Sequence, residues 1–127
     1  MSSNQHTSDN EQLVDRLWNQ IWIEGALEKL AEVIADPFVR HTRDGTEVTT
    51  PAEYAHHIES AIRTIRGTEM VVDHIASVDD MVFARLHLHG LNLSTGTTVK
   101  ITWLTQYRVA EGRIAEAWTM HQSGLDW

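Results

Sequence analysis

The chain has 127 residues and 42% of them are hydrophobic, which suits one compact domain with a single core. Its formal net charge is -8 without any run of lysine or arginine, so the positive surface that nucleic acids and acidic membranes require is excluded. It has no cysteine, which excludes disulfides, thiolate nucleophiles and Cys-based zinc sites. A small neutral or weakly charged molecule fits this balance better as a partner.

The first ten residues, MSSNQHTSDN, are polar and are expected to form a disordered tail, followed by a single domain over residues 11–127. The tail lacks the apolar core of a signal peptide, and no later segment is long and apolar enough to cross a bilayer. We therefore expect a cytoplasmic protein without a membrane partner.

Two amphipathic helices are predicted first. Ser8-Asp-Asn-Glu11 has the pattern of a capping box, and apolar residues then recur at helical spacing as far as Trp22. After Gly25, a second helix over residues 27–34 must end before Asp36-Pro37, because the residue before a proline disfavours helical geometry. A short strand should follow at residues 38–42.

A third helix is predicted to begin at Thr50-Pro51-Ala52-Glu53, which supplies a cap, a proline at the first helical position and the reciprocal glutamate. It should run to about Arg66, with Tyr54 and His57 on its buried stripe. From Thr68 onward the period changes to two, and turn signals separate four long antiparallel strands. Three N-terminal helices packed on a curved antiparallel sheet give an α+β fold.

The last two predicted strands carry the pattern Tyr-x-Val-x-x-Gly-x-Ile-x-Glu-x-Trp, from Tyr107 to Trp118. This pattern resembles the terminal hairpin of SnoaL-like polyketide cyclases, in the nuclear transport factor 2-like superfamily that also includes limonene epoxide hydrolase and ketosteroid isomerase. Residues 31–41 and 82–90 resemble two further strands of the family, so the resemblance covers roughly residues 11–122. It implies a conical, cystatin-like α+β barrel around a pocket.

The same resemblance places neutral residues where relatives carry acids. The catalytic aspartate of the cyclases, four residues after the tryptophan, would fall on Gln122, which cannot act as an acid or base near neutral pH. The two aspartates of the epoxide hydrolases would fall on His87 and Met120. Neither family mechanism is therefore expected to operate unchanged.

Strand alternation then assigns residues to the two faces of the sheet. With the hairpin tryptophan pointing inward, the inner face is predicted to carry Ile101, Trp103, Thr105, Tyr107, Ile114, Glu116, Trp118, Met120 and Gln122. The outer face would carry Ala115, Ala117, Thr119 and His121. The epoxide hydrolase resemblance turns Arg85, His87 and His89 inward. The opposite row of Val82, Ala84, Leu86 and Leu88 would then be covered by a homodimer that packs sheet against sheet.

Histidine could replace the missing aspartate, because imidazole serves as both base and acid near neutral pH. We expect His87 or His41 to remove a proton and Arg85 to stabilise the resulting oxyanion. The predicted substrate-binding residues are Tyr54, His57, His89, Trp103, Tyr107, Trp118, Met120 and Gln122. The alternative is that the histidines are ordinary, partly buried residues.

Two other readings of these side chains stay open. His87 and His89 have metal-ligand spacing, and His41 could be a third ligand, but the resembling families are generally metal-free and we predict no metal. Trp18 and Trp22 lie at helical spacing and are expected in the core, whereas Trp103 and Trp118 are expected to contact a ligand.

The leading functional prediction is a cofactor-free cyclase, isomerase, lyase or hydratase acting on an apolar, oxygenated molecule of polyketide or terpenoid type. The neutral residues at Met120 and Gln122 favour an alternative, a non-catalytic ligand-binding protein. A third possibility is an oligomerisation module, because the kinase association domains of the superfamily assemble through the same sheet.

Overall fold

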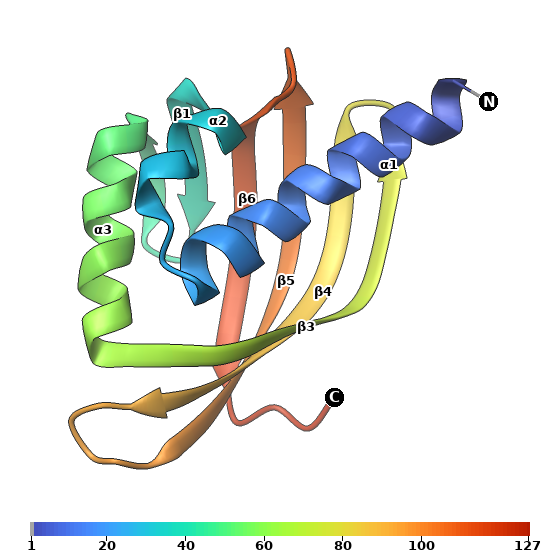
Figure 1. Cartoon of the computed structure of the whole chain (residues 1–127). Helices are drawn as coiled ribbons and strands as arrows, with labels where there is room; N and C mark the ends of the chain where they lie inside the picture. The colour runs from blue at the N-terminus through green and yellow to red at the C-terminus, as the bar shows by residue number, and fades with distance from the viewer. Residues whose placement is uncertain (1) are drawn as a thin grey trace.

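A computed structural model of the chain describes residues 2–127, with side chains from Asp9 onward. Six strands form one mixed sheet in the order β2-β1-β6-β5-β4-β3, and the helices lie on one face of it (Figure 1). The predicted α+β fold of three helices on a curved sheet is confirmed. The sheet is open, with β2 and β3 at its edges.

The helical elements are α1 (Ser2–Asp15), the π-helical η1 (Arg16–Ile23), the 3-10 turn η2 (Leu27–Lys29), α2 (Leu30–Val33) and α3 (Pro51–Thr64). The strands are β1 (Ile34–Thr42), β2 (Gly45–Thr49), β3 (Ile65–Val78), β4 (Met81–Asn92), β5 (Thr98–Ala110) and β6 (Arg113–Ser123). In Figure 1, α1 and η1 cross the sheet diagonally, and α3 lies towards the β1 side. Within the described residues, no helix is long and apolar enough to cross a membrane.

The start of the first helix differs from the prediction. Helix α1 begins at Ser2, so the capping box at Ser8 does not mark its start, and the Ser8 side chain lies outside the described ones. The predicted tail over residues 1–10 falls largely on residues whose side chains are outside the described set, so it stays a prediction. Helix α1 continues directly into η1, where the backbone N–H of Glu24 donates to the Asn19 carbonyl oxygen, five residues earlier.

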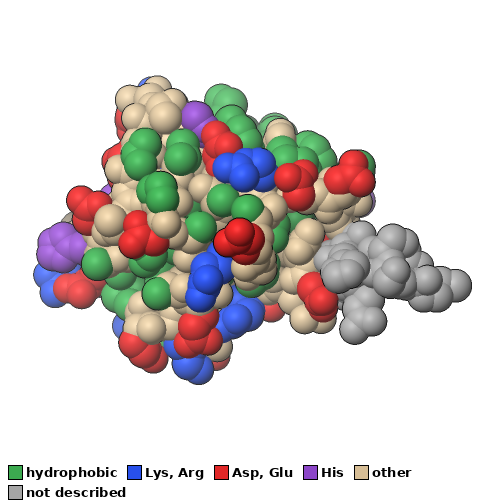
Figure 2. Space-filling model, turned by 90° about the horizontal axis from the view of Figure 1, so that it is seen from above, with side chains coloured by type: hydrophobic (Ala, Val, Ile, Leu, Met, Phe, Trp, Pro, Cys, Tyr) green, Lys and Arg blue, Asp and Glu red, His purple; other side chains and the backbone are tan. Residues whose placement is uncertain are grey.

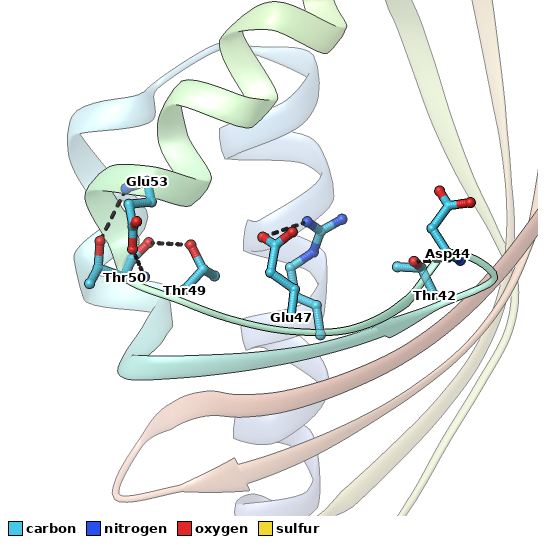
Figure 3. Close-up of polar contacts among 7 residues, drawn as sticks. Thr42, Asp44, Glu47, Thr49, Thr50 and Glu53 are labelled. Carbon is cyan, nitrogen blue, oxygen red and sulfur yellow. Dashed lines mark hydrogen bonds and ion pairs between the residues drawn. The ribbon is translucent and has the colours of Figure 1, made fainter.

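The other two helices follow their local signals. Helix α2 ends at Val33, before the Asp36-Pro37 bond, as predicted. At the start of α3 both hydrogen bonds of the capping box between Thr50 and Glu53 are present, with lengths of 3.0 and 3.2 Å (Figure 3). The helix ends at Thr64, slightly earlier than predicted.

The sheet has a parallel pair that the antiparallel prediction missed. Strand β1 pairs in parallel with β6, with His41 opposite Trp118, and pairs antiparallel with β2. It is also longer than the predicted strand at residues 38–42. Strand β1 thereby brings residues from the N-terminal half beside the terminal hairpin.

A one-residue bulge in β6 reverses the predicted faces of that strand. Val109 lies opposite Ile114, but the next pair is Arg108 with Glu116, so Ala115 is an extra residue. Because side chains alternate, every residue after the bulge changes face. The inner face therefore carries Ala117, Thr119 and His121, and the outer face carries Glu116, Trp118, Met120 and Gln122.

The faces of β4 are also opposite to the prediction. Val82, Ala84, Leu86 and Leu88 are all buried and lie opposite the inner residues Tyr107, Thr105, Trp103 and Ile101 of β5. Arg85, His87 and His89 therefore lie on the outer face, away from the helices. The apolar row packs against the helices because burying it removes the most hydrocarbon from water. The core comprises Val14, Leu17, Trp18, Ile21, Leu30, Val33, Ile34, Phe38, Tyr54, Ile58, Met70, Val82, Ala84, Leu86, Leu88, Ile101, Tyr107, Val109, Ile114 and Ala117.

Candidate functional site

A cavity of about 360 Å³ lies between the helices and the inner face of the sheet. Its wall is mostly apolar. It is lined by Leu17, Trp18, Trp22, Phe38, Arg40, Thr42, Tyr54, His57, Ala61, Ile62, Thr64, Ile65, Gly67, Leu88, Ile101, Trp103, Tyr107, Ala117, Thr119 and His121. The volume falls in the range of small-molecule sites.

One wall of the cavity is a continuous series of aromatic rings. The Trp18 ring centroid lies 5.1 Å from Trp103 and 5.6 Å from Trp22. Tyr54 continues the series, with its centroid 6.5 Å from Trp22 and 5.3 Å from Phe38. Such rings have few rotatable bonds and present a large apolar area, so this wall suits an apolar ligand that contains rings.

A buried hydrogen bond fixes part of this wall. Trp18 Nε1 donates to Tyr107 Oη at 2.8 Å, joining η1 to β5. Burial raises the pKa of Tyr107, so its hydroxyl stays neutral at physiological pH. The bond holds both rings in place and satisfies the polar atoms that these two core residues bring with them.

Two histidines stand beside the aromatic wall. The His57 ring stacks on Tyr54 with centroids 5.9 Å apart, and the His121 ring lies 5.3 Å from Trp103. Both histidines are exposed, so they are accessible to solvent as well as to the cavity. Partial burial, and then the positive charge of Arg40, lower the pKa of His57. At neutral pH His57 is therefore an uncharged imidazole that can accept a proton.

Arg40 provides the cationic part of the wall. Its Cζ lies 4.6 Å from the centroid of the Tyr54 ring, and its Nη1 lies 3.5 Å from Glu47 Oε1 (Figure 3). The Arg40 side chain is 16% exposed, whereas that of Glu47 is 61% exposed. Burial raises the pKa of Tyr54, which is consistent with a neutral hydroxyl beside the guanidinium. The Tyr54 ring is thus bordered by both Arg40 and His57.

A polar atom of the same wall is unsatisfied. Trp22 Nε1 is buried and makes no hydrogen bond of good geometry within the described residues. Its indole does lie near enough to the Tyr54 hydroxyl to oppose, in small part, the rise in the pKa of Tyr54. Buried donors are normally satisfied, so this atom is a natural partner for an acceptor on a ligand. Among the described lining residues there is no aspartate or glutamate.

Four of the predicted site residues line the cavity, namely Tyr54, His57, Trp103 and Tyr107. The others lie on the outer face of the sheet: His41, Arg85, His87, His89, Trp118, Met120 and Gln122. The structure therefore separates the three residues predicted to be catalytic from the cavity. The reasons are the bulge in β6, the burial of the apolar row of β4 and, for His41, its place on β1 between Arg40 and Thr42, which both line the cavity.

The outer histidines have carboxylate partners of their own. His41 Nε2 is 2.6 Å from Glu116 Oε2, and His41 Nδ1 is 2.9 Å from Thr46 Oγ1. The hydrogen bond from His41, and then Arg108 at 3.1 Å, lower the pKa of Glu116. The His41 ring also stacks on Trp118 at 5.1 Å. These contacts form a network on the outer face of the sheet, away from the aromatic cavity.

The second outer cluster contains His87, whose Nδ1 lies 2.9 Å from Asp73 Oδ2, with Arg85 Nε 4.0 Å from the same oxygen. The rings of His87 and His89 are perpendicular, with centroids 4.9 Å apart. Within residues 9–127, no three histidine or acidic side chains are placed to share a metal ion. The alternative of a metal held by His41, His87 and His89 is therefore not assembled.

The polar residues of the cavity that the sequence did not reveal include Arg40, Trp22 and His121. For Arg40 a signal was present, because Phe38 is the large apolar residue of its strand and residues two apart share a face. Trp22 was assigned to the core at its helical spacing, and it lies in the wall between core and cavity. His121 could not have been found without the bulge.

Comparison with solved structures identifies the same fold in several proteins. IdmH, a proposed polyketide cyclase from Streptomyces antibioticus, is 22% identical with a TM-score of 0.74, covering 89% of this chain and 91% of IdmH. A proposed polyketide cyclase from Acidithiobacillus ferrooxidans has a TM-score of 0.79 at 14% identity, with 90% and 88% covered. An epoxide hydrolase from M. tuberculosis resembling limonene epoxide hydrolase has a TM-score of 0.76 at 12% identity, with 92% and 85% covered.

No curated protein matches the sequence. The profile of the SnoaL-like domain matches residues 14–117, which includes every element from the end of α1 to the first half of β6. That span is most of the chain and includes both sides of the cavity. The chain therefore belongs to the SnoaL-like domain family.

Proposed function

We propose that the protein is a small-molecule enzyme that uses cofactor-free acid/base chemistry in the cavity, on an apolar, oxygenated substrate. The reaction is of the cyclase, isomerase, lyase or hydratase type. In the members of this group that act next to a carbonyl group, it starts with removal of the α-proton. The observation that carries the proposal is an aromatic cavity bordered by an uncharged imidazole, His57, and by a buried donor, Trp22 Nε1, that makes no hydrogen bond of good geometry within the described residues.

Each of the two groups has a role that suits its environment. His57 takes the proton, because its lowered pKa keeps it neutral at physiological pH. Trp22 Nε1 donates to the carbonyl oxygen, where negative charge develops as the proton leaves. Both residues contact the Tyr54 ring and line the cavity, which places them in the same wall. The assignment of the substrate to the polyketide or terpenoid class rests on the relatives alone.

The test is exchange of carbon-bound hydrogen for deuterium. In heavy water, 2-tetralone, an apolar two-ring ketone, should lose its α-protons faster with the protein than with an equal concentration of free imidazole, followed by proton NMR. His57→Gln should lower the protein-dependent rate by about a hundredfold or more, since general-base catalysis commonly contributes that much. His56→Gln is the matched control, because His56 is the preceding residue of α3 and does not line the cavity.

A non-catalytic ligand-binding protein is the second candidate, favoured by the lack of any carboxylate among the described lining residues. In that case 2-tetralone would quench the fluorescence of the cavity tryptophans, yet its exchange rate would equal that with imidazole. Equal exchange rates for the wild type and His57→Gln would likewise contradict the enzymatic proposal.

The partner proposed for the outer face is a second copy of the chain. The reason differs from the one predicted, because Val82, Ala84, Leu86 and Leu88 belong to the core. The outer face instead exposes Val48, Val78, Phe83, Leu104 and Met120, with Leu104 50% and Met120 70% exposed. Light scattering should give twice the chain mass of 14.4 kDa, and Leu104→Glu with Met120→Glu should give a monomer. A monomeric wild-type protein would contradict this assembly.

A further inference from the structure

We infer that the ligand of the cavity carries a carboxylate, and that Arg40 is the residue that binds it. This inference rests on the proposed function, because it concerns the substrate of the same site. It narrows the substrate from apolar and oxygenated to an aromatic or polycyclic acid anion.

The first support is the incomplete pairing of a largely buried cation. The Arg40 side chain is only 16% exposed, and a guanidinium cannot lose its charge to relieve the cost of burial. Glu47 is the only carboxylate that pairs with it within the described residues, at 3.5 Å. A charge-assisted N–H···O hydrogen bond is normally about 2.7–2.9 Å, so this pair leaves the donors of Arg40 underused.

The second support is the position of Glu47 relative to the cavity. Glu47 comes from the edge strand β2 (Figure 3). Its side chain is 61% exposed and it does not line the cavity. Arg40, on β1, does line the cavity. A ligand carboxylate can therefore approach the guanidinium from the cavity while Glu47 stays on the solvent side or moves away into water.

The third support is the charge of the wall compared with that of the whole chain. The protein has a net charge of -8, and acidic and basic side chains are interspersed on the face shown in Figure 2. The described lining residues nevertheless include no acidic side chain and include one arginine. In a mostly apolar site this single cation dominates the local field, because the surroundings screen it less than water does. A neutral ligand would leave that charge with the distant, exposed carboxylate of Glu47 as its ion-pair partner.

The positions of Arg40 and His57 around the Tyr54 ring determine the orientation of the ligand. Arg40 Cζ lies 4.6 Å from the Tyr54 centroid and His57 stacks on the same ring at 5.9 Å. A carboxylate on Arg40 therefore places the adjoining carbon skeleton beside His57, with its rings along the aromatic wall of Trp18, Trp22 and Trp103. Arg40 is a binding residue here, whereas His57 acts on the proton.

The test compares two ligands of nearly equal shape, 2-naphthoate and its neutral amide, 2-naphthamide. Binding is measured by quenching of tryptophan fluorescence and by calorimetry at neutral pH, where the acid is ionised. The wild-type protein should bind the carboxylate about tenfold to a hundredfold more tightly than the amide, as expected for a charge-assisted hydrogen bond. In Arg40→Gln that preference should disappear, while the affinity for the amide changes by less than about threefold.

Glu47→Gln supplies an independent readout, because Glu47 is exposed and its replacement should not disturb folding. Removing the competing carboxylate should strengthen the binding of 2-naphthoate and leave that of 2-naphthamide unchanged. Equal affinities of the wild type for the two ligands, or a preference retained in Arg40→Gln, would overturn the inference while leaving the cavity as a ligand site. Failure of both ligands to bind would overturn the inference. The proposed function is tested separately with neutral 2-tetralone. It fails if the protein exchanges the α-protons of that ketone no faster than free imidazole does.

Discussion

Replacing Tyr107 by phenylalanine should destabilise the protein by about 1–3 kcal/mol, the usual cost of leaving a buried donor unsatisfied. Tyr107 Oη accepts the hydrogen bond of Trp18 Nε1 at 2.8 Å, and the two residues are 1% and 5% exposed. For a chain of 127 residues, each kcal/mol corresponds to about 3–5 °C in Tm.

The assay is urea unfolding of four proteins: the wild type, Tyr107→Phe, Trp18→Phe and the double variant. Trp18→Phe also creates a void, so it should be costly by itself. Once the indole donor is gone, however, the tyrosine hydroxyl has less to lose, and Tyr107→Phe should cost about 1 kcal/mol less in that background. A Tyr107→Phe cost below about 0.5 kcal/mol, or the same cost in both backgrounds, would refute the hydrogen-bond argument.

The burial of Tyr107 also predicts a pH dependence. Burial raises the pKa of Tyr107, so the folded protein keeps its proton where the unfolded chain has lost it. This contribution to stability is fully present below the unfolded pKa of about 10 and is lost as the pH rises above it. The stability of Tyr107→Phe should therefore fall less steeply in that alkaline range than that of the wild type.

Three further predictions concern other parts of the structure. Gly90→Ala should cost about 1–3 kcal/mol, because its Cβ would lie 2.8 Å from a backbone oxygen, whereas Gly67→Ala meets only side-chain atoms and should cost less in urea unfolding. The lowered pKa of Glu116, due first to the hydrogen bond from His41, stabilises the fold above the unfolded pKa of about 4.3, and that stability is lost as pH falls below it. In Glu116→Gln, the loss of stability at acidic pH should be smaller than in the wild type. An equal loss in both proteins would contradict the pairing of Glu116 with His41. His57 should titrate below about 6.5 by NMR, and a higher value would contradict its role as a neutral base.

The elements that the sequence predicted well are those with local signals. Thr50 and Glu53 form the capping box that their spacing indicates, and Val33 ends its helix before the Asp36-Pro37 pair. The resemblance of the terminal hairpin to the SnoaL-like family also led to the correct fold. Each of these signals is contained in a few consecutive residues, so no long-range information is needed to interpret it.

The faces of the strands were less predictable, because a single bulge outweighs an alternation pattern. The extra residue Ala115 turns Trp118, Met120 and Gln122 outward, and nothing in its neighbourhood marks it. On β4 the pattern itself was informative, since a row from Val82 to Leu88 is entirely apolar and belongs in the core. Following the resemblance of Arg85 instead placed the candidate catalytic residues on the wrong face.

The most direct test of the cavity as the functional site is a crystal structure of the protein with bound 2-naphthoate. The two rings should lie against Trp18 and Trp103, and the carboxylate should lie within hydrogen-bonding distance of Arg40 and beside His57. A naphthoate bound only on the outer face, against Trp118 and Met120, would contradict it. Saturable binding of 2-naphthoate in solution, together with an empty cavity in the crystal, would also contradict it.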